Sequence, residues 1–165
     1  MLLEVFNGAD RREAIAALRP CVDIGRWGEA LADGRPYASV DEVVVAAEVA
    51  ARPFSAAEIE AALAHHPRIG DRARGDHREA ALSRAEQSGV DPSDAEVQAA
   101  LASGNLEYER RFGRVFLIRA AGRSAGEILA ALNERLGHTP EEEDEIVAEQ
   151  LREIAILRLK GILAE

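Results

Sequence analysis

Two adjacent histidines, His65 and His66, directly precede Pro67. Proline disfavours helical geometry for the residue before it, so a helix that begins near Ser55 should end by His65 and leave His66 outside. The negative end of a helix favours the protonated imidazole, and a histidine placed there can exchange a proton near neutral pH. The alternative is that both histidines only cap the last helical carbonyls, which is the more common outcome for an arbitrary His-Pro pair.

A second polar group is formed by Ser83, Glu86 and Gln87. Their spacing of i, i+3 and i+4 places the three side chains on one face of a helix. A hydroxyl, a carboxylate and an amide that project together can hold a polar ring and exchange a proton. Ser-x-x-Glu is also a capping signature, so Ser83 could simply begin a helix. On these residues alone, the two interpretations weigh equally.

An arginine lies on the apolar stripe of the last predicted helix. The stripe runs through Val147, Leu151 and Ile154, and Arg158 occupies its next position. A buried guanidinium requires an anionic partner, so Arg158 either pairs with an internal acid or meets an anionic ligand. Structural pairing is the usual outcome for a buried arginine.

A metal site is the weaker alternative for the histidine-rich stretch. Its ligands would be His65, His66, His77, Asp71 and Asp76. Adjacent histidines on a helix point about 100° apart, and no second spaced pair of ligands is present. The sequence therefore favours a site without a metal.

Capping boxes predict where the helices that carry these residues begin. Five pairs fit the pattern: Ser39/Glu42, Ser55/Glu58, Ser93/Glu96, Ser124/Glu127 and Thr139/Glu142. Together with the apolar spacing, they predict helices at about 9–19, 24–32, 40–51, 56–65, 78–88, 94–112, 125–136 and 140–163. The acids at 141–145 are interpreted as helix-start carboxylates that complement the helix dipole.

Residues 115–121 interrupt this pattern with a continuous apolar run between Gly113 and Gly122. By composition the run could be a strand, but a lone strand would have no partner in this sequence. We therefore predict a buried extended connector. For the chain as a whole, residues 1–165, we predict an all-α single domain built as a bundle of about eight helices.

Composition limits the partners. The 20 Lys and Arg residues against 30 Asp and Glu residues give a formal net charge of −10, which argues against nucleic acid or an anionic membrane as the main partner. The single Cys21 cannot form an internal disulfide, which suits a reducing compartment. No segment approaches 18 apolar residues, and no apolar signal region begins the chain. We expect a cytoplasmic protein.

Four blocks of sequence occur in a specific order. They are HHPRIG at 65–70, SRAEQSG at 83–89, YERRFGRVFLIRAAGRSAGEILAAL at 108–132 and EIAILRLKGIL at 153–163. Together they resemble the family of OHCU decarboxylases, which act on 2-oxo-4-hydroxy-4-carboxy-5-ureidoimidazoline in urate degradation. Any one block would be weak, but the four in this order are specific, and the likeness covers nearly the whole chain.

The resemblance implies an all-α enzyme that releases CO₂ and forms (S)-allantoin from a small-molecule substrate, with no metal or organic cofactor. It implies that His66 and Glu86 are catalytic, and it leaves open which of them delivers the proton. The substrate-binding residues that it implies are Pro67, Ser83, Gln87, Phe116, Leu117, Ile118 and Arg158. The three residues at 116–118 are expected to bind the ring through their backbone groups.

Two further expectations come from this resemblance. Many family members have Asp-Leu after the His-Pro motif, where this chain has Arg68 and Ile69, so the loop contacts of residue 68 should differ. The family is often dimeric, which leaves a homodimer open. The alternative function is a non-catalytic helical binding module of the same fold. The presence of His66, Glu86, Gln87 and Arg158 together argues against it, because a binding module needs no acid–base pair.

Overall fold

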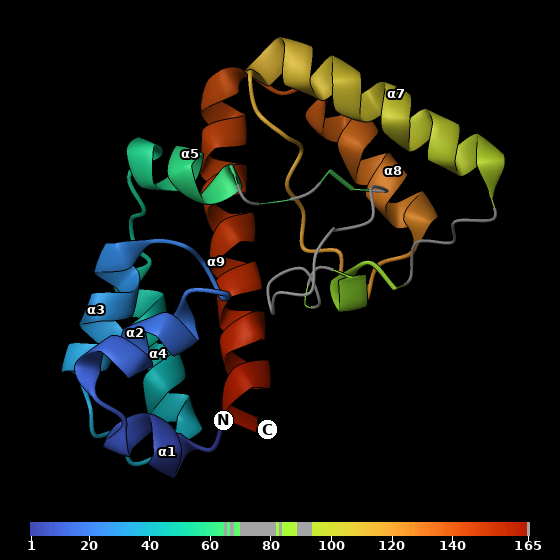
Figure 1. Ribbon diagram of the computed structural model, residues 1–165. Coiled ribbons are helices and arrows are strands. Elements are labelled where there is room, and N and C mark those ends of the chain that lie inside the picture. Colours follow the sequence, from blue (N-terminus) through green and yellow to red (C-terminus); the bar gives the residue numbers. More distant parts are fainter. Residues whose placement is uncertain (65, 67, 70–81, 83, 89–93, 165) are drawn as a thin grey trace. The chain divides into compact units, whose positions relative to one another are not determined.

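The computed structural model describes residues 1–64, 66, 68–69, 82, 84–88 and 94–164 (Figure 1). Over these residues the secondary structure is helical and contains no strand, so the predicted all-α class is confirmed. None of the described helices is long and apolar enough to cross a membrane. The chain divides into two compact units, one of Met1–Ala62 with Arg152–Glu165 and one of Leu63–Leu151.

The first unit is built mainly from the N-terminal helices. They are α1 (Leu3–Gly8), α2 (Arg11–Leu18), α3 (Gly25–Asp33), α4 (Val40–Ala50) and α5 (Ala56–Leu63). Helix α3 contacts both α2 and α4. Trp27 of α3 is fully buried and donates its indole N–H to the Ala47 carbonyl over 3.0 Å. This bond satisfies the polar atom of the largest side chain in the unit and ties α3 to α4.

The predicted helix at about 9–19 differs from the structure at its N-terminal end. Asp10 caps α2: it accepts a 2.8 Å hydrogen bond from the Glu13 N–H, and the Glu13 carboxylate accepts from the Asp10 N–H in return. Ala9 is extended, at φ −64° and ψ 151°, and separates α2 from α1. Capping boxes headed by Ser or Thr do not mark this boundary, because the cap is an aspartate.

Three of the predicted capping boxes form both of their hydrogen bonds. They are Ser55/Glu58, Ser124/Glu127 and Thr139/Glu142. At α4 the Ser39 hydroxyl accepts from the Glu42 N–H, but the Glu42 carboxylate bonds the N–H of Ala38 instead of that of Ser39. The prediction of helix starts from these pairs is confirmed at all four.

The fifth predicted cap, Ser93, lies outside the described residues, and the structure places the N-cap of this helix one residue later. Helix α7 (Ala95–Phe112) has Asp94 as its N-cap, and the Asp94 carboxylate accepts from the Val97 N–H over 3.1 Å. A carboxylate at this position satisfies an orphan amide and also complements the positive end of the helix dipole. The helix therefore begins one residue later than predicted.

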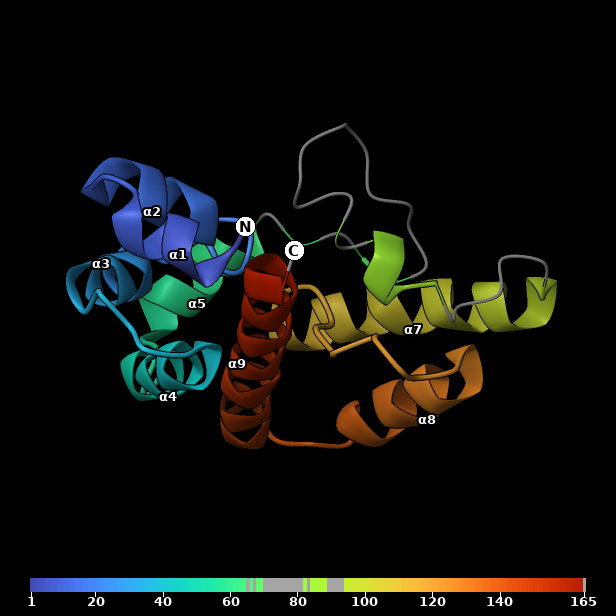
Figure 2. The same cartoon turned by 90° about the horizontal axis from the view of Figure 1, so that it is seen from below.

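The second unit is centred on α7 and α8 (Ala125–Arg135), which lie side by side in Figures 1 and 2. Gly104 permits this approach, because a Cβ atom at that position would lie 2.5 Å from Cδ2 of Leu132. Helix α9 (Pro140–Ala164) begins in this unit and ends in the other. The core contains Ile69, Leu101, Tyr108, Phe116, Ile118, Ala120, Ile128 and Leu132.

A connector without helix or strand joins α7 to α8 over residues 115–120 (Figure 1). Phe116, Leu117 and Ile118 are 2%, 4% and 4% exposed. The predicted buried connector is therefore confirmed. It begins after Gly113, which ends α7 in the left-handed conformation at φ +73°.

Gly113→Ala is expected to lower the free energy of unfolding by about 1–2 kcal/mol, the cost of a left-handed conformation for a residue with a Cβ atom. Gly161 is the matched control, because it lies on an exposed turn of α9 where an added Cβ meets nothing within 4 Å. Gly161→Ala should stabilise the protein by about 0.5–1 kcal/mol. Urea denaturation of both variants measures the contrast, and equal effects of the same sign would contradict it.

Candidate active site

His66 lies just beyond the end of a helix, as predicted. Helix α5 ends at Leu63, and the backbone N–H of His66 donates to the Leu63 carbonyl over 3.1 Å. The imidazole belongs to a half-buried residue outside the helix. His65 and Pro67 lie outside the described residues. That the end of α5 favours the protonated imidazole of His66 stays a prediction.

The two residues that follow the His-Pro motif are held on α7. Arg68 forms a two-pronged ion pair with Glu109, Nε to Oε1 at 2.6 Å and Nη2 to Oε2 at 2.8 Å. Ile69 is buried in the core, and its carbonyl accepts from the side-chain amide of Asn105 over 2.8 Å. The loop contact made by Arg68 is therefore an ion pair with α7, and the segment after His66 is anchored at two successive residues.

Glu86 and Gln87 lie on a short helical segment and the turn that ends it. Leu82 and residues 84–86 are helical, and the turn is closed by a 3.2 Å hydrogen bond from the Ser88 N–H to the Ala85 carbonyl. Glu86 and Gln87 are both half-buried. Ser83 lies outside the described residues. We expect His66 and Glu86 to form a hydrogen-bonded acid–base pair, and this pairing stays a prediction.

The connector at 116–118 is held through its backbone by side chains from α8 and α9. The Leu117 carbonyl accepts from Nη1 of Arg135 over 2.7 Å. The N–H of Arg119 donates to Oε1 of Gln150 over 2.9 Å. The Arg135 guanidinium also lies over the Phe116 ring, 4.5 Å from its centroid, within cation–π range. The backbone of this connector is therefore fixed on both sides of Ile118.

Arg135 belongs to a buried network around Glu143. The Glu143 carboxylate is fully buried and accepts from Arg135 Nε over 2.9 Å and from the Tyr108 hydroxyl over 2.5 Å. His138 Nδ1 lies 3.1 Å from its second oxygen. Glu143 lies in the first turn of α9, as predicted for the acids at 141–145, but its side chain also neutralises a buried arginine.

The network shifts two pKa values. Burial alone would raise the pKa of Glu143, but hydrogen bonds from Arg135, Tyr108 and His138 outweigh it and hold the pKa below its ordinary value. Burial, together with the hydrogen bond to Glu143, raises the pKa of Tyr108 to about 12. Glu143 is therefore ionised and Tyr108 neutral at physiological pH.

Arg158 is buried, as the apolar stripe predicted, with 2% of its surface exposed. Its Nη1 donates to the Pro20 carbonyl over 2.9 Å, which ties α9 to the turn after α2 within the first unit. The stripe residues Val147, Leu151 and Ile154 are likewise buried. Arg158 therefore has a structural contact, and its predicted role toward a ligand stays a prediction.

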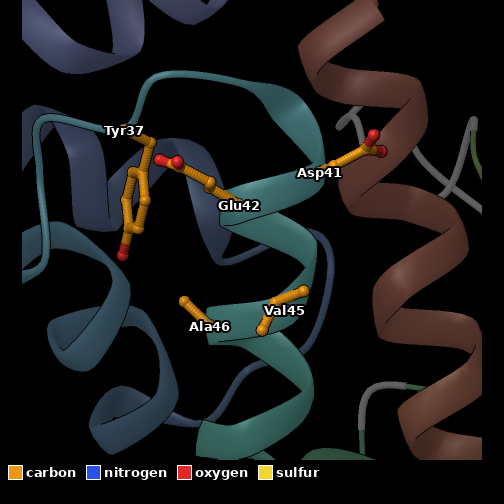
Figure 3. A pocket seen from close by; sticks show the side chains of 5 residues that line it. All are labelled: Tyr37, Asp41, Glu42, Val45 and Ala46. Carbon is orange, nitrogen blue, oxygen red and sulfur yellow. The ribbon is translucent and has the colours of Figure 1, made fainter.

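A metal site and a surface cavity are the alternatives to this site. Among the described residues, no group of three or more His, Cys, Asp or Glu side chains could hold a metal ion. Four of the five ligands considered for a metal lie outside those residues: His65, Asp71, Asp76 and His77. A cavity of about 450 Å³ is lined by Tyr37, Asp41, Glu42, Val45 and Ala46 (Figure 3). The Tyr37 hydroxyl is bonded to the Leu31 carbonyl, and the Asp41 carboxylate points away from Tyr37 and Glu42. This cavity brings together no acid–base pair.

Sequence reasoning missed Arg135, Glu143 and Gln150. A signal for Glu143 was present, because it lies four residues before Val147 and so continues the apolar stripe of α9 toward its N-terminus. Arg135 lies on α8 three residues after the buried Leu132, in the last turn, where a basic residue is ordinary. Nothing in the sequence pattern distinguishes Gln150 from other polar residues of α9.

The chain is similar to several known proteins. The family model described as OHCU decarboxylase matches residues 7–160. The 2-oxo-4-hydroxy-4-carboxy-5-ureidoimidazoline decarboxylase of Amia calva is 33% identical over 135 residues, covering 79% of this chain and 75% of that protein. The protein of the same name from Haloferax volcanii is 28% identical over 161 residues, covering 96% of this chain and 94% of that protein.

The fold is also that of a solved structure. An OHCU decarboxylase crystallised in the presence of (S)-allantoin superposes with a TM-score of 0.74 and 22% sequence identity, over 95% of this chain and 100% of the other. At this identity the likeness establishes the fold. The family model, which spans 154 of the 165 residues, counted from 7 to 160, establishes the membership. The chain therefore belongs to the OHCU decarboxylase family.

Proposed function

We propose that this protein decarboxylates 2-oxo-4-hydroxy-4-carboxy-5-ureidoimidazoline to (S)-allantoin and CO₂, without a metal or organic cofactor. The observation that carries the proposal is the family match over residues 7–160, because this range includes His66, Glu86, Gln87 and Arg158. The half-buried positions of His66 and Glu86 support it, since partial burial suits groups that meet a substrate and exchange protons with it.

The reaction needs three things from the protein. As the bond to the carboxylate breaks and CO₂ leaves, the electron pair enters the ring, where the neighbouring C=N group accepts it and its nitrogen takes up a proton to become N–H. The ring carbon that becomes stereogenic then takes a proton, and the ring hydroxyl becomes a carbonyl as its own proton is lost. The protein must orient the carboxylate, stabilise the charge on the ring and deliver the proton to one face.

His66 and Glu86 are the proposed acid–base pair. An imidazole at a helix end, next to a carboxylate, can hold or give a proton near neutral pH. Gln87 and Ser83 would hold the polar ring beside this pair, and Pro67 would shape the wall next to His66. The backbone of Phe116, Leu117 and Ile118 would bind the ring, and Arg158 would meet an anionic or carbonyl oxygen of the substrate.

The setting of the reaction is also a proposal. The substrate is a small molecule. We propose that the protein acts in the cytoplasm and that it can form a homodimer. We further propose that the two compact units function as one domain, supported by the single family model that spans residues from both. Sedimentation equilibrium distinguishes the monomer from the dimer.

A coupled assay tests the proposed reaction. Urate oxidase and hydroxyisourate hydrolase generate the unstable substrate from urate, and CO₂ release is followed with and without this protein. The proposal expects release well above the spontaneous rate, in proportion to protein concentration and unchanged by a chelator. Release at the spontaneous rate would remove the decarboxylase assignment, and loss of activity with the chelator would point to a metal enzyme.

A further inference from the structure

The backbone at Ile118 is held through the peptide groups on either side of this residue. The Leu117 carbonyl, in the peptide group before Ile118, accepts from Arg135, and the Arg119 N–H, in the peptide group after it, donates to Gln150. Among the described residues, the Ile118 N–H and C=O have no hydrogen-bond partner. Ile118 is 4% exposed, so two polar groups that are ordinarily satisfied lie in a largely buried residue.

The direction of these two groups follows from peptide geometry. Both peptide bonds next to Ile118 are trans, so the C=O and N–H of each planar unit point in opposite directions. Because Arg135 holds the Leu117 carbonyl, the Ile118 N–H points away from Arg135. Because Gln150 holds the Arg119 N–H, the Ile118 carbonyl points away from Gln150. One residue therefore presents a donor and an acceptor, each fixed by a different side chain.

Arg135 is itself fixed. Its Nε donates to Glu143, and Glu143 also accepts from the Tyr108 hydroxyl. Within the described part of the chain, the guanidinium pairs with this carboxylate and donates to the Leu117 carbonyl. The Phe116 ring lies against the guanidinium face. A charge-assisted hydrogen bond in a buried site is stronger than one between neutral groups. Arg135 is therefore suited to hold the peptide group between Leu117 and Ile118 in one orientation.

We propose that Arg135 and Gln150 are positioning residues that fix the peptide groups on either side of Ile118, so that its N–H and C=O form a rigid donor–acceptor edge for an amide or ureide group of the substrate. The inference rests on the proposed function, since it assigns the edge to the same ligand. A cyclic ureide carries adjacent N–H and C=O groups, which are complementary to this edge. A preorganised edge binds more tightly because the protein loses little conformational entropy on binding.

Gln150 provides the cleaner test, because it is half-buried and neutral. Gln150→Leu removes the acceptor for the Arg119 N–H, whereas Gln150→Glu keeps an oxygen there. Glu149→Leu is the matched control, one residue away on the exposed side of α9. The KM and kcat of the coupled reaction and the thermal midpoint are measured for the wild type and the three variants.

We expect Gln150→Leu to raise KM about three- to tenfold, the effect of one lost hydrogen bond, with kcat nearly unchanged and only a small fall in the thermal midpoint, because the partly buried Arg119 N–H loses its acceptor. Gln150→Glu should restore KM to within about twofold of the wild type, and Glu149→Leu should leave it unchanged. A KM for Gln150→Leu equal to that of Glu149→Leu would overturn the inference while leaving the function intact. The inference would also be overturned if the KM increase of Gln150→Leu accompanied a large loss of stability and Gln150→Glu did not restore KM. Absence of wild-type turnover would instead remove the proposed function, and the inference with it.

Discussion

His66→Ala is expected to lower kcat by about 10²–10⁴-fold, the usual contribution of a positioned general acid or base. The reason is that the imidazole, which lies just past the end of α5, is half of the proposed acid–base pair. Glu86→Ala should lower kcat in the same range. Steady-state kinetics of the coupled reaction measure both, and the far-ultraviolet circular dichroism of each variant should match that of the wild type.

His65→Ala is the matched control for this prediction, because it removes the neighbouring imidazole, to which no catalytic role is assigned. Its kcat should stay within about threefold of the wild-type value, the smallest effect that a supporting contact would produce. If His66→Ala keeps a near-normal rate while His65→Ala loses it, the catalytic histidine has been assigned to the wrong residue. If both keep the rate, neither imidazole takes part in the proton transfer.

Glu143→Leu is expected to lower the free energy of unfolding by about 3–5 kcal/mol, because it leaves the buried Arg135 without its carboxylate. The adjacent acid is the control: Asp144 forms an exposed ion pair with Arg114, and its side chain is 67% exposed. Asp144→Ala should cost less than about 1 kcal/mol. Urea denaturation at pH 7 measures both. Equal costs would show that the ion pair of Glu143 contributes no more than a surface pair.

The same network predicts a pH dependence. The pKa of folded Glu143 is held below its ordinary value, so the stabilisation is present above the pKa of the unfolded chain and is lost as the pH falls through that of the folded state. The wild type should therefore lose more stability than Glu143→Gln between pH 7 and pH 3. Denaturation midpoints at several pH values test this, and parallel pH curves for the two proteins would contradict it.

Local signals in the sequence predicted the elements well. Ser55, Ser124 and Thr139 each carry a capping box that forms as predicted, because a cap depends only on residues three apart. The connector at 115–120 was also predictable, since an apolar run between two glycines has few alternatives. Asp10 shows the limit of this reasoning, because an aspartate cap escapes a search for serine and threonine.

The positions of site residues depend on contacts between distant segments, which local patterns do not encode. Arg135 and Glu143 form a pair only because the end of α8 and the start of α9 meet within one core. Gln150 gains a role only through a backbone N–H that lies 31 residues away in the chain. The burial of Arg158 was predictable from its stripe, but its contact with the Pro20 carbonyl was not.

The most direct test of the central claim is the optical activity of the product. Decarboxylation in solution leaves both faces of the planar ring open to the proton, whereas a positioned acid delivers it to one face. With substrate generated in situ, circular dichroism should report (S)-allantoin accumulating in the presence of the wild-type protein, at a rate proportional to its concentration. The His66→Ala and Glu86→Ala proteins should give little of this signal. Racemic allantoin formed at the spontaneous rate with the wild-type protein would contradict the account.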